Sequence, residues 1–425
     1  MRSYSATHNL TAISATTGES AINAFAAVDL SLLSDMGDMI NLSPRREDNS
    51  DEANGKEEPD QVYDNGYMAE TTRNHNRAQP QHFAYLYGFG LGNVTTVAAG
   101  SGYLHTITPM VGGLDTAREL PSMSMLTRMG ETVLKRRFAS MFVDQVNATF
   151  AMDDWVKISG TLKGTGKHED SIIEETVSSA GTSVSLLLDA NGVQGATADE
   201  RMDSIHRIRA EVTAGSWTDV TFTAVSAATP AAITIVAPSA VATAINYKIL
   251  YAPVESADFV FPARVVESPL RVAEMSFNLG GAWNGTAFVG GKAMGAELRN
   301  IQCSLSNNSK VSFVPGGGGS YASMHERGGR KQTIKVDRSF RDFIFQQHIK
   351  DNDQLGCYIK CLGSEFDTGH NYQVEIIYPK LGLLSAPISV SDKKLAESGD
   401  FVVLEDSTYG SVIVRVKNLW AGYVG

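Results

Sequence analysis

The feature that most constrains this chain is an alternation of apolar and polar side chains with a period of two residues. The clearest example is 155–162, and the stretches 371–378 and 411–417 repeat the pattern. In the first stretch, Val156, Ile158, Gly160 and Leu162 alternate with Trp155, Lys157, Ser159 and Thr161. Shorter versions lie around 122–129, 142–150, 271–277, 298–305 and 332–337. Because neighbouring side chains of a strand point to opposite faces, the pattern predicts half-buried strands and a mainly β, antiparallel sandwich or barrel.

Two short segments have a helical pattern instead. Residues 80–88 begin near Pro80 and place Phe83, Leu86 and Tyr87 on one face, and Gly88, Gly90 and Gly92 end the pattern. Residues 340–349 place Phe340, Phe343 and Ile344 on one stripe, with Ser339 as N-cap and Asp342 closing a capping box. We expect both helices to flank a sheet.

Two segments have the composition of loops. Residues 45–61 contain seven acids and three bases, with Gly and Pro between them, and predict a solvated loop or flexible arm. Residues 314–321 contain four consecutive glycines, which disfavour a strand.

The stretch 168–258 differs from the rest of the chain, because it carries −8 of the total net charge of −11. It contains a helix-like piece at 197–210 and an uncharged run, 220–247, that is rich in Ala, Thr and Ser and is interrupted by Pro230 and Pro238. That run predicts small-residue strands and turns rather than a membrane span. The sequence therefore predicts a core formed by 1–167 and 259–425, with a small β-rich domain inserted at 168–258.

Overall charge and cysteine content narrow the function classes. A net charge of −11 disfavours a protein whose main task is to grip phosphate backbones. Three cysteines in 425 residues cannot form a disulfide framework, so we expect folding in a reducing, bacterial-type cytoplasm. The first residues contain no apolar core typical of a secretory signal.

No motif predicts an active site. The glycines of 88–92 lack the strand-to-helix context of a dinucleotide loop, and 160–168 misses the spacing of a phosphate-binding loop. Cys357 and Cys361 are expected to be buried thiols on one strand, as is Cys303. The basic run 135–137 is expected to form salt bridges on a strand. We therefore expect no enzyme activity, cofactor or metal.

A β-rich, acidic chain without catalytic motifs suits either a binding module or a self-assembling structural protein. Four stretches resemble, in this order, the major tail tube proteins of long-tailed bacteriophages. They are PQHFAYLYGFGLG through GYLHTITP at 80–109, the strand series of 121–167, the run 296–342 with NIQCSLSNN and KVDRSFRDF, and the ending GHNYQVEIIYPK through KNLWAGY at 369–423. The resemblance covers most of 1–167 and 259–425, and 168–258 resembles the Ig-like surface domains that such tubes often carry.

The resemblance implies a β-sandwich core whose copies form hexameric rings that stack into a tube for genome delivery. It implies that inner strands line the lumen, with Lys135, Arg137, Lys157, Ser159, Thr161, Arg299 and Gln302 as candidate lining residues. Candidate ring-to-ring contacts are Arg45, Arg46, Glu47, Asp48, Glu57, Glu58, Gly316, Gly317, Gly318 and Gly319.

The resemblance also implies partners and a location. The partners are other copies of the chain, the tail tip or baseplate, the tail terminator, a tape measure protein in the lumen, and double-stranded DNA that passes without specific binding. The location is the virion tail, after folding in the host cytoplasm and without membrane insertion. Two alternatives remain: the inner tube of a contractile injection system, and a β-sandwich adhesin or carbohydrate-binding protein.

Overall fold

The computed structural model of the chain describes residues 5–424 except 54, 111–118, 131–133, 181–183, 237–243, 255, 318 and 392. It confirms the prediction of a mainly β protein with antiparallel sheets. The chain divides into two compact units. The larger contains Ala12–Met125, Phe138–Lys167 and Pro262–Gly425, and the smaller contains Met1–Thr11, Leu126–Arg137 and His168–Phe261.

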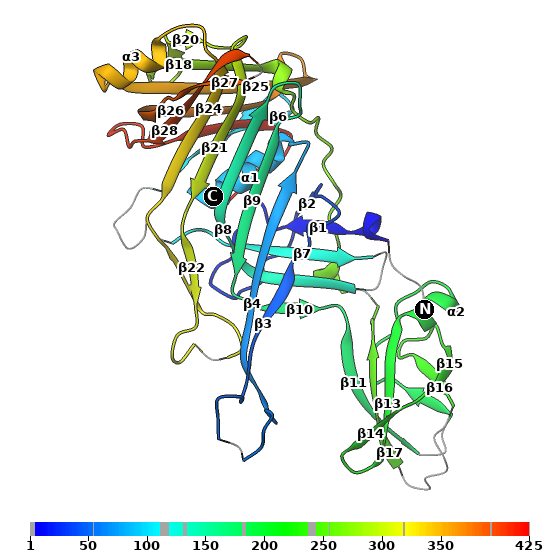
Figure 1. Ribbon diagram of the computed structural model, residues 1–425. Coiled ribbons are helices and arrows are strands. Elements are labelled where there is room, and N and C mark those ends of the chain that lie inside the picture. The colour runs from blue at the N-terminus through cyan, green and yellow to red at the C-terminus, as the bar shows by residue number, and fades with distance from the viewer. Residues whose placement is uncertain are drawn as a thin grey trace. The chain divides into compact units, whose positions relative to one another are not determined.

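The larger unit contains two layers of strands (Figure 1). In the first layer, strands pair in the order β3 (Asn41–Asp48), β4 (Val62–His75), β9 (Lys157–Gly164), β8 (Leu134–Ala151), β21 (Leu298–Ser306), β24 (Lys331–Ser339) and β28 (Lys394–Val403). In the second, the order is β18 (Met275–Trp283), β25 (Gln354–Asp367), β26 (His370–Ser385), β29 (Ile413–Asn418), β6 (Gly102–Pro109) and β5 (Gly92–Ala99). The end of β26 also pairs with β28, so this strand joins the two layers.

Shorter strands complete this part of the chain. They are β1 (Leu10–Ile13), β2 (Leu30–Leu32), β7 (Met123–Met129), β19 (Phe288–Val289), β20 (Lys292–Ala293), β22 (Ser309–Ser312), β23 (Met324–Arg327) and β27 (Ile388–Ser391). Nearly all the strands predicted from the alternation are present, but 271–277 becomes strand only from Met275.

Helix α1 (Pro80–Leu91) is buried along its whole length. It contacts β9 of the first layer and β5, β6, β26 and β29 of the second. The predicted helix is present and packs on strands, but it extends beyond Gly88 to Leu91 and strands of both layers enclose it. Gly88 and Gly90 lie inside the helix, and Gly92, with φ 91°, ends it in the left-handed conformation. A side chain at Gly160 of β9 would clash with the helix, because Leu86 occupies the space where a Cβ would lie.

The N-terminus of α1 meets a buried carboxylate. Gln81 N donates to Glu267 Oε2 at 2.9 Å, and the Gln79 side chain donates to the Glu267 carbonyl at 2.8 Å. A carboxylate at this position satisfies an otherwise unpaired backbone N–H and interacts favourably with the helix dipole. Burial nevertheless outweighs these hydrogen bonds and raises the pKa of Glu267 from 4.5 to about 7.

Helix α3 (Ile344–Asp351) begins later than predicted. Ser339 is the last residue of β24 rather than an N-cap, and the N-cap position is occupied by Phe343. The predicted stripe is also wrong, since Phe343 is 71% exposed and Phe345 is the buried aromatic residue. Asp342 does not close a capping box, because Ser339 is not the N-cap; its Oδ1 accepts from Ile344 N at 3.2 Å and lies 3.0 Å from the buried Arg338 guanidinium.

The smaller unit has a separate core. In its four-stranded sheet the strands lie in the order β11 (Ile173–Ala180), β17 (Ala244–Tyr251), β13 (Ile205–Thr213) and β14 (Ser216–Asp219). In its three-stranded sheet the order is β12 (Ser185–Leu187), β16 (Ala232–Ile235) and β15 (Phe222–Val225). Strand β10 (His168–Asp170) precedes them, and α2 (Ala198–Asp203) is shorter than the helix-like pattern, which continues as β13. The apolar cluster of this unit lies entirely between Val177 and Tyr251. No helix of the described ranges is long and apolar enough to span a membrane.

The buried Glu267 carboxyl should make the free energy of unfolding depend on pH. Its pKa is raised in the folded state, so it stabilises the fold below pH 4.5, and this contribution is lost as the pH rises through 7. As the pH is raised from 4.5 to 8, wild type should lose this contribution and Glu267→Gln should not. The difference in free energy of unfolding between the variant and wild type should therefore shift by about 3 kcal/mol in favour of the variant. Urea titrations at several pH values measure this difference. His75, whose pKa burial lowers to about 3, is present in both proteins and cancels.

The matched control is Glu274→Gln, at an exposed position. Its pH profile should run parallel to that of wild type. A parallel profile for Glu267→Gln would instead show that the Glu267 carboxyl is not perturbed.

Candidate functional site: a polar sheet face and a projecting hairpin

The strand register places polar side chains in rows across the first layer. One row is Asn74, Ser159, Asn147, Ser304 and Thr333, and the next is Thr72, Thr161, Gln145, Ser306 and Lys331. A third row is Lys157, Thr149, Gln302 and Lys335. We call these three rows the polar sheet face. They come from β4, β9, β8, β21 and β24, so segments far apart in sequence build one continuous surface.

The opposite side of the same strands is apolar and buried. It includes Ile158, Leu162, Val146, Ala148, Cys303, Leu305 and Ile334, each no more than 2% exposed. All members of the polar sheet face are exposed or half-buried. The alternation seen in the sequence thus separates the core from a solvated surface of hydroxyl and amide groups.

Two lysines on and beside this face have acidic partners. Lys157 Nζ lies 2.6 Å from Asp154, and Lys163 Nζ lies 2.9 Å from the buried Asp144. Lys331 and Lys335 of β24 are exposed. The face therefore consists mostly of uncharged hydrogen-bond donors and acceptors, with lysines at some positions.

Four of the predicted lumen residues lie on the polar sheet face: Lys157, Ser159, Thr161 and Gln302. The structure does not place the other three there. Arg299 lies at an irregularity of β21 and donates to Ser339 Oγ at 3.2 Å. Lys135 and Arg137 belong to the smaller unit, where Lys135 Nζ donates to the Phe259 carbonyl and Arg137 pairs with Glu169 and Asp258.

Sequence reasoning missed most of the face. Thr72, Asn74, Asn147, Thr149 and Ser304 were not among the predicted residues. The available signal was the outward half of the alternation in 142–150 and 298–305, which is uncharged and polar.

The β3–β4 hairpin, which carries the first predicted ring-contact segment, contacts residues in and next to the second. Tyr67 N donates to the Ser320 carbonyl at 2.8 Å, and the Arg45 guanidinium lies 4.8 Å from the centre of the Phe313 ring. Gly66, with φ 94°, leaves room for the Ser320 carbonyl where a Cβ would clash. The β3–β4 hairpin is thereby held against the loop between β22 and β23.

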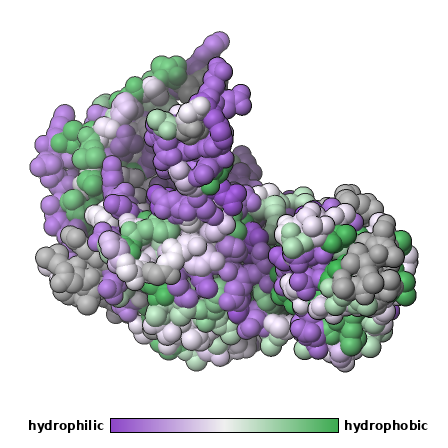
Figure 2. Space-filling model, turned by 90° about the horizontal axis from the view of Figure 1, so that it is seen from below, coloured by the Kyte–Doolittle hydropathy of each residue, from purple (hydrophilic) through white to green (hydrophobic). Residues whose placement is uncertain are grey.

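Parts of these segments differ from expectation. Arg45, Arg46, Glu47 and Asp48 belong to strand β3 rather than to a loop, because they pair with β4. Glu57 and Glu58 lie in the exposed loop that follows. Gly316, Gly317 and Gly319 lie between β22 and β23, and Gly318 lies outside the described residues. Seen from below, hydrophilic residues cover the upper and central part of the view, and paler to hydrophobic residues gather along its lower edge (Figure 2).

Potentially reactive groups are buried. Cys303, Cys357 and Cys361 are free thiols no more than 1% exposed, and burial raises the pKa of Cys303 to about 12. Within the described ranges, no group of three His, Cys, Asp or Glu residues is arranged to hold a metal ion. No protein-family model matches the chain, and no curated protein sequence matches it.

The two sides of β8 allow a direct test of the face assignment. We expect Asn147→Lys to change the free energy of unfolding by less than about 0.5 kcal/mol, because its side chain is solvated. Ala148→Lys should destabilise by more than about 4 kcal/mol, because it places an unpaired charge in the core. Denaturant titration of both variants measures the contrast. Equal effects would show that this strand does not separate core from solvent.

Proposed function

We propose that this protein is a tube-forming structural protein of a phage tail, whose copies close into rings that stack around a DNA conduit. The observation that carries the proposal is the polar sheet face. A solvated sheet that consists mostly of hydroxyl and amide groups is suited to line a channel. The order of sequence segments that resembles tail tube proteins supports the same assignment.

The chemistry of the face suits a passing polyanion. Each phosphate that a lysine or arginine neutralises adds a salt-dependent contribution to DNA affinity, so a basic lining would retain DNA. Lys157 has an acidic neighbour, and most members of the three rows carry no charge. Water-mediated contacts with hydroxyl and amide groups would let the duplex move with little change in free energy.

Strand β5 supplies a surface for self-association. It pairs with β6, and its residues Thr95–Ala98 are all exposed, with Val97 at 60%. No charged residue or proline occurs in Gly92–Ala99, although such residues usually protect exposed edges from pairing with another chain. A head-to-tail contact between this strand and a different surface of the next copy generates a ring when the rotation closes.

Electron microscopy of negatively stained protein over a concentration series tests the proposal. We expect rings of uniform diameter with a stained centre, and tubes at higher concentration. Val97→Lys places a charge on the exposed edge strand, so it should reduce ring formation while leaving the fold intact. Val212→Lys, at an exposed valine of the smaller unit, is the control for an added charge away from that edge. Dispersed monomers at every concentration, with or without an added tail tip, would overturn the proposal in favour of a monomeric binding module.

The smaller unit provides a second prediction. Its apolar cluster is separate, and Ile173 lies directly across from Tyr251 in the β11–β17 ladder. We expect that replacing 174–250 with an Asn-Gly turn leaves ring and tube formation intact, because the turn closes two paired strands. The same microscopy measures the outcome. A folded variant that no longer assembles would show that the smaller unit takes part in the contacts between copies.

A further inference from the structure

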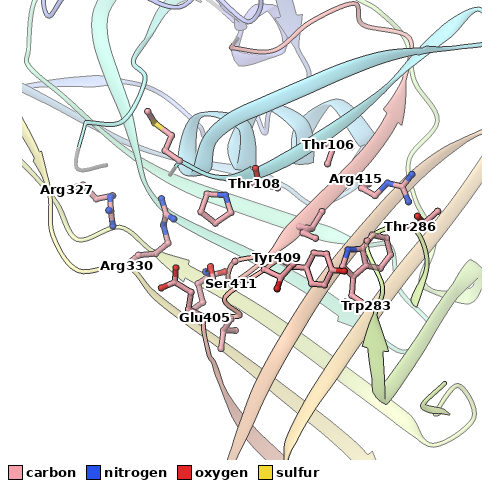
Figure 3. Close-up of a pocket in the computed structure, with 18 residues that line it drawn as sticks. Thr106, Thr108, Trp283, Thr286, Arg327, Arg330, Glu405, Tyr409, Ser411 and Arg415 are labelled. Carbon is pink, nitrogen blue, oxygen red and sulfur yellow. The ribbon is translucent and has the colours of Figure 1, made fainter. Parts of the chain in front are cut away.

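The larger unit contains a cavity of about 950 Å³ that the polar sheet face does not use. It is lined from β6, β24, β28 and β29 and from the turns around Trp283 and Tyr409. The cavity is at the upper end of the usual size for small-molecule sites. Figure 3 shows Arg330 and Glu405 at one end, Arg415, Trp283 and Thr286 at the other, and Tyr409 and Ser411 between them.

Arg330 is held at its end of the cavity with part of its guanidinium unsatisfied. Its Nε donates to Asn307 Oδ1 at 3.2 Å, and Asn307 is itself fixed by hydrogen bonds to the carbonyls of Gly90 and Val143. The Arg330 Nη2 is buried and has no hydrogen-bond partner among the described residues. Burial and the nearby Arg327 lower the pKa of Arg330 to about 10, so it is still charged at neutral pH. A ligand that brings an acceptor to this nitrogen would remove the cost of a buried, unsatisfied donor.

The charges around the cavity favour a ligand with a single negative group. Glu405 is the one acidic residue among the described residues that line it. Its charge raises the pKa of Arg330, but it is exposed and does not satisfy Nη2. At the other end, Arg415 Nη1 already lies 3.1 Å from Glu375. A carboxylate therefore suits the site better than a phosphate dianion, which Glu405 would repel more strongly.

The rest of the cavity offers hydroxyl groups and two aromatic rings. Trp283 and Tyr409 are half-buried, and Gln332 donates to Ser411 Oγ at 2.9 Å. The other hydroxyl groups belong to Thr106, Thr108, Thr286 and Thr408. Hydroxyl and amide groups can both donate to and accept from the hydroxyls of a ligand, and an aromatic ring offers an apolar surface to its C–H groups. This combination suits a sugar ring.

Two tight turns hold the aromatic residues in place. In the turn that follows Trp283, Asn284 Oδ1 accepts from Thr286 N at 3.0 Å. In the other, Asp406 Oδ1 accepts from Tyr409 N at 2.9 Å. Because the backbone at both rings is already ordered, a ligand would lose less free energy in fixing them.

We propose that this cavity binds an acidic oligosaccharide, a short sugar chain that carries a carboxylate. The carboxylate accepts a charge-assisted hydrogen bond from Arg330, and sugar rings pack on Tyr409 and Trp283. The hydroxyl groups of the ligand bond to the threonine and serine side chains between these residues. The inference goes beyond the proposed function and does not rest on it, because every group that it uses belongs to the larger unit of one copy.

Isothermal titration calorimetry with trigalacturonate, a hyaluronan tetrasaccharide and sialyllactose tests the inference, at protein concentrations where microscopy shows no assembly. We expect the full chain to bind at least one of them at millimolar concentration, and added salt to weaken the binding. Arg330→Gln and Trp283→Ala should each weaken it by about tenfold or more. The exposed Arg341→Gln is the matched control and should bind as wild type does. The methyl ester of the bound saccharide, which lacks the charge, should bind as weakly to wild type as the acid does to Arg330→Gln.

Three results would overturn the inference. One is that folded wild type binds none of the three saccharides at millimolar concentration, and another is that Arg330→Gln binds them as wild type does. The third is that inorganic phosphate binds through Arg330 and the saccharides do not, because the cavity would then be a phosphate site. Thermal unfolding checks each variant. If Arg330→Gln does not fold, Arg330→Lys replaces it, because lysine keeps the charge and loses the planar group that pairs with a carboxylate.

Discussion

Helix α1 has no solvated face, and the larger unit is built to accommodate that constraint. A helix enclosed by strands needs small residues where backbones approach, and it needs partners for its terminal peptide groups. Gly160 meets the first need, because Leu86 of the helix occupies the space where its Cβ would be. Glu267 serves the N-terminus, and Asn307 donates to the Gly90 carbonyl near the C-terminus. The positions of β9, β21 and the segment at Glu267 follow from these contacts.

A buried ion network fixes the far part of the first layer. Arg338 and Glu397 are at most 1% exposed and lie 2.7 Å apart on adjacent strands, and Glu297 and Asp342 complete the set around the guanidinium. Removing one member of such a network leaves an uncompensated charge, which costs far more than the net contribution of the intact pair. The network therefore specifies the β24–β28 register more than it adds stability.

The positions of the strands could be predicted from the sequence better than the contacts that helices and strands make with one another. Alternation located strands such as β9 and β29 because each buries one face, which is a local property. The pattern at 80–88 gave no sign that Gln81 and His82 are also buried, since their burial depends on contacts with other elements, Glu267 and His75. The polar sheet face is predicted only in part, because no single segment shows that β4 pairs with β9 or that β24 pairs with β21. The cavity of about 950 Å³ in the larger unit is lined by segments that lie between Thr106 and Arg415 in the sequence, and no local pattern connects them.

Strand β26 gives the larger unit a mechanical property. It pairs with β25 and β29 in one layer and with β28 in the other, so one strand belongs to the hydrogen-bonded ladders of both layers. A bend imposed on one layer would therefore be passed to the other through the backbone as well as through packed side chains. In the proposed tube, such coupling within the larger unit would leave curvature to be taken up at the contacts between copies.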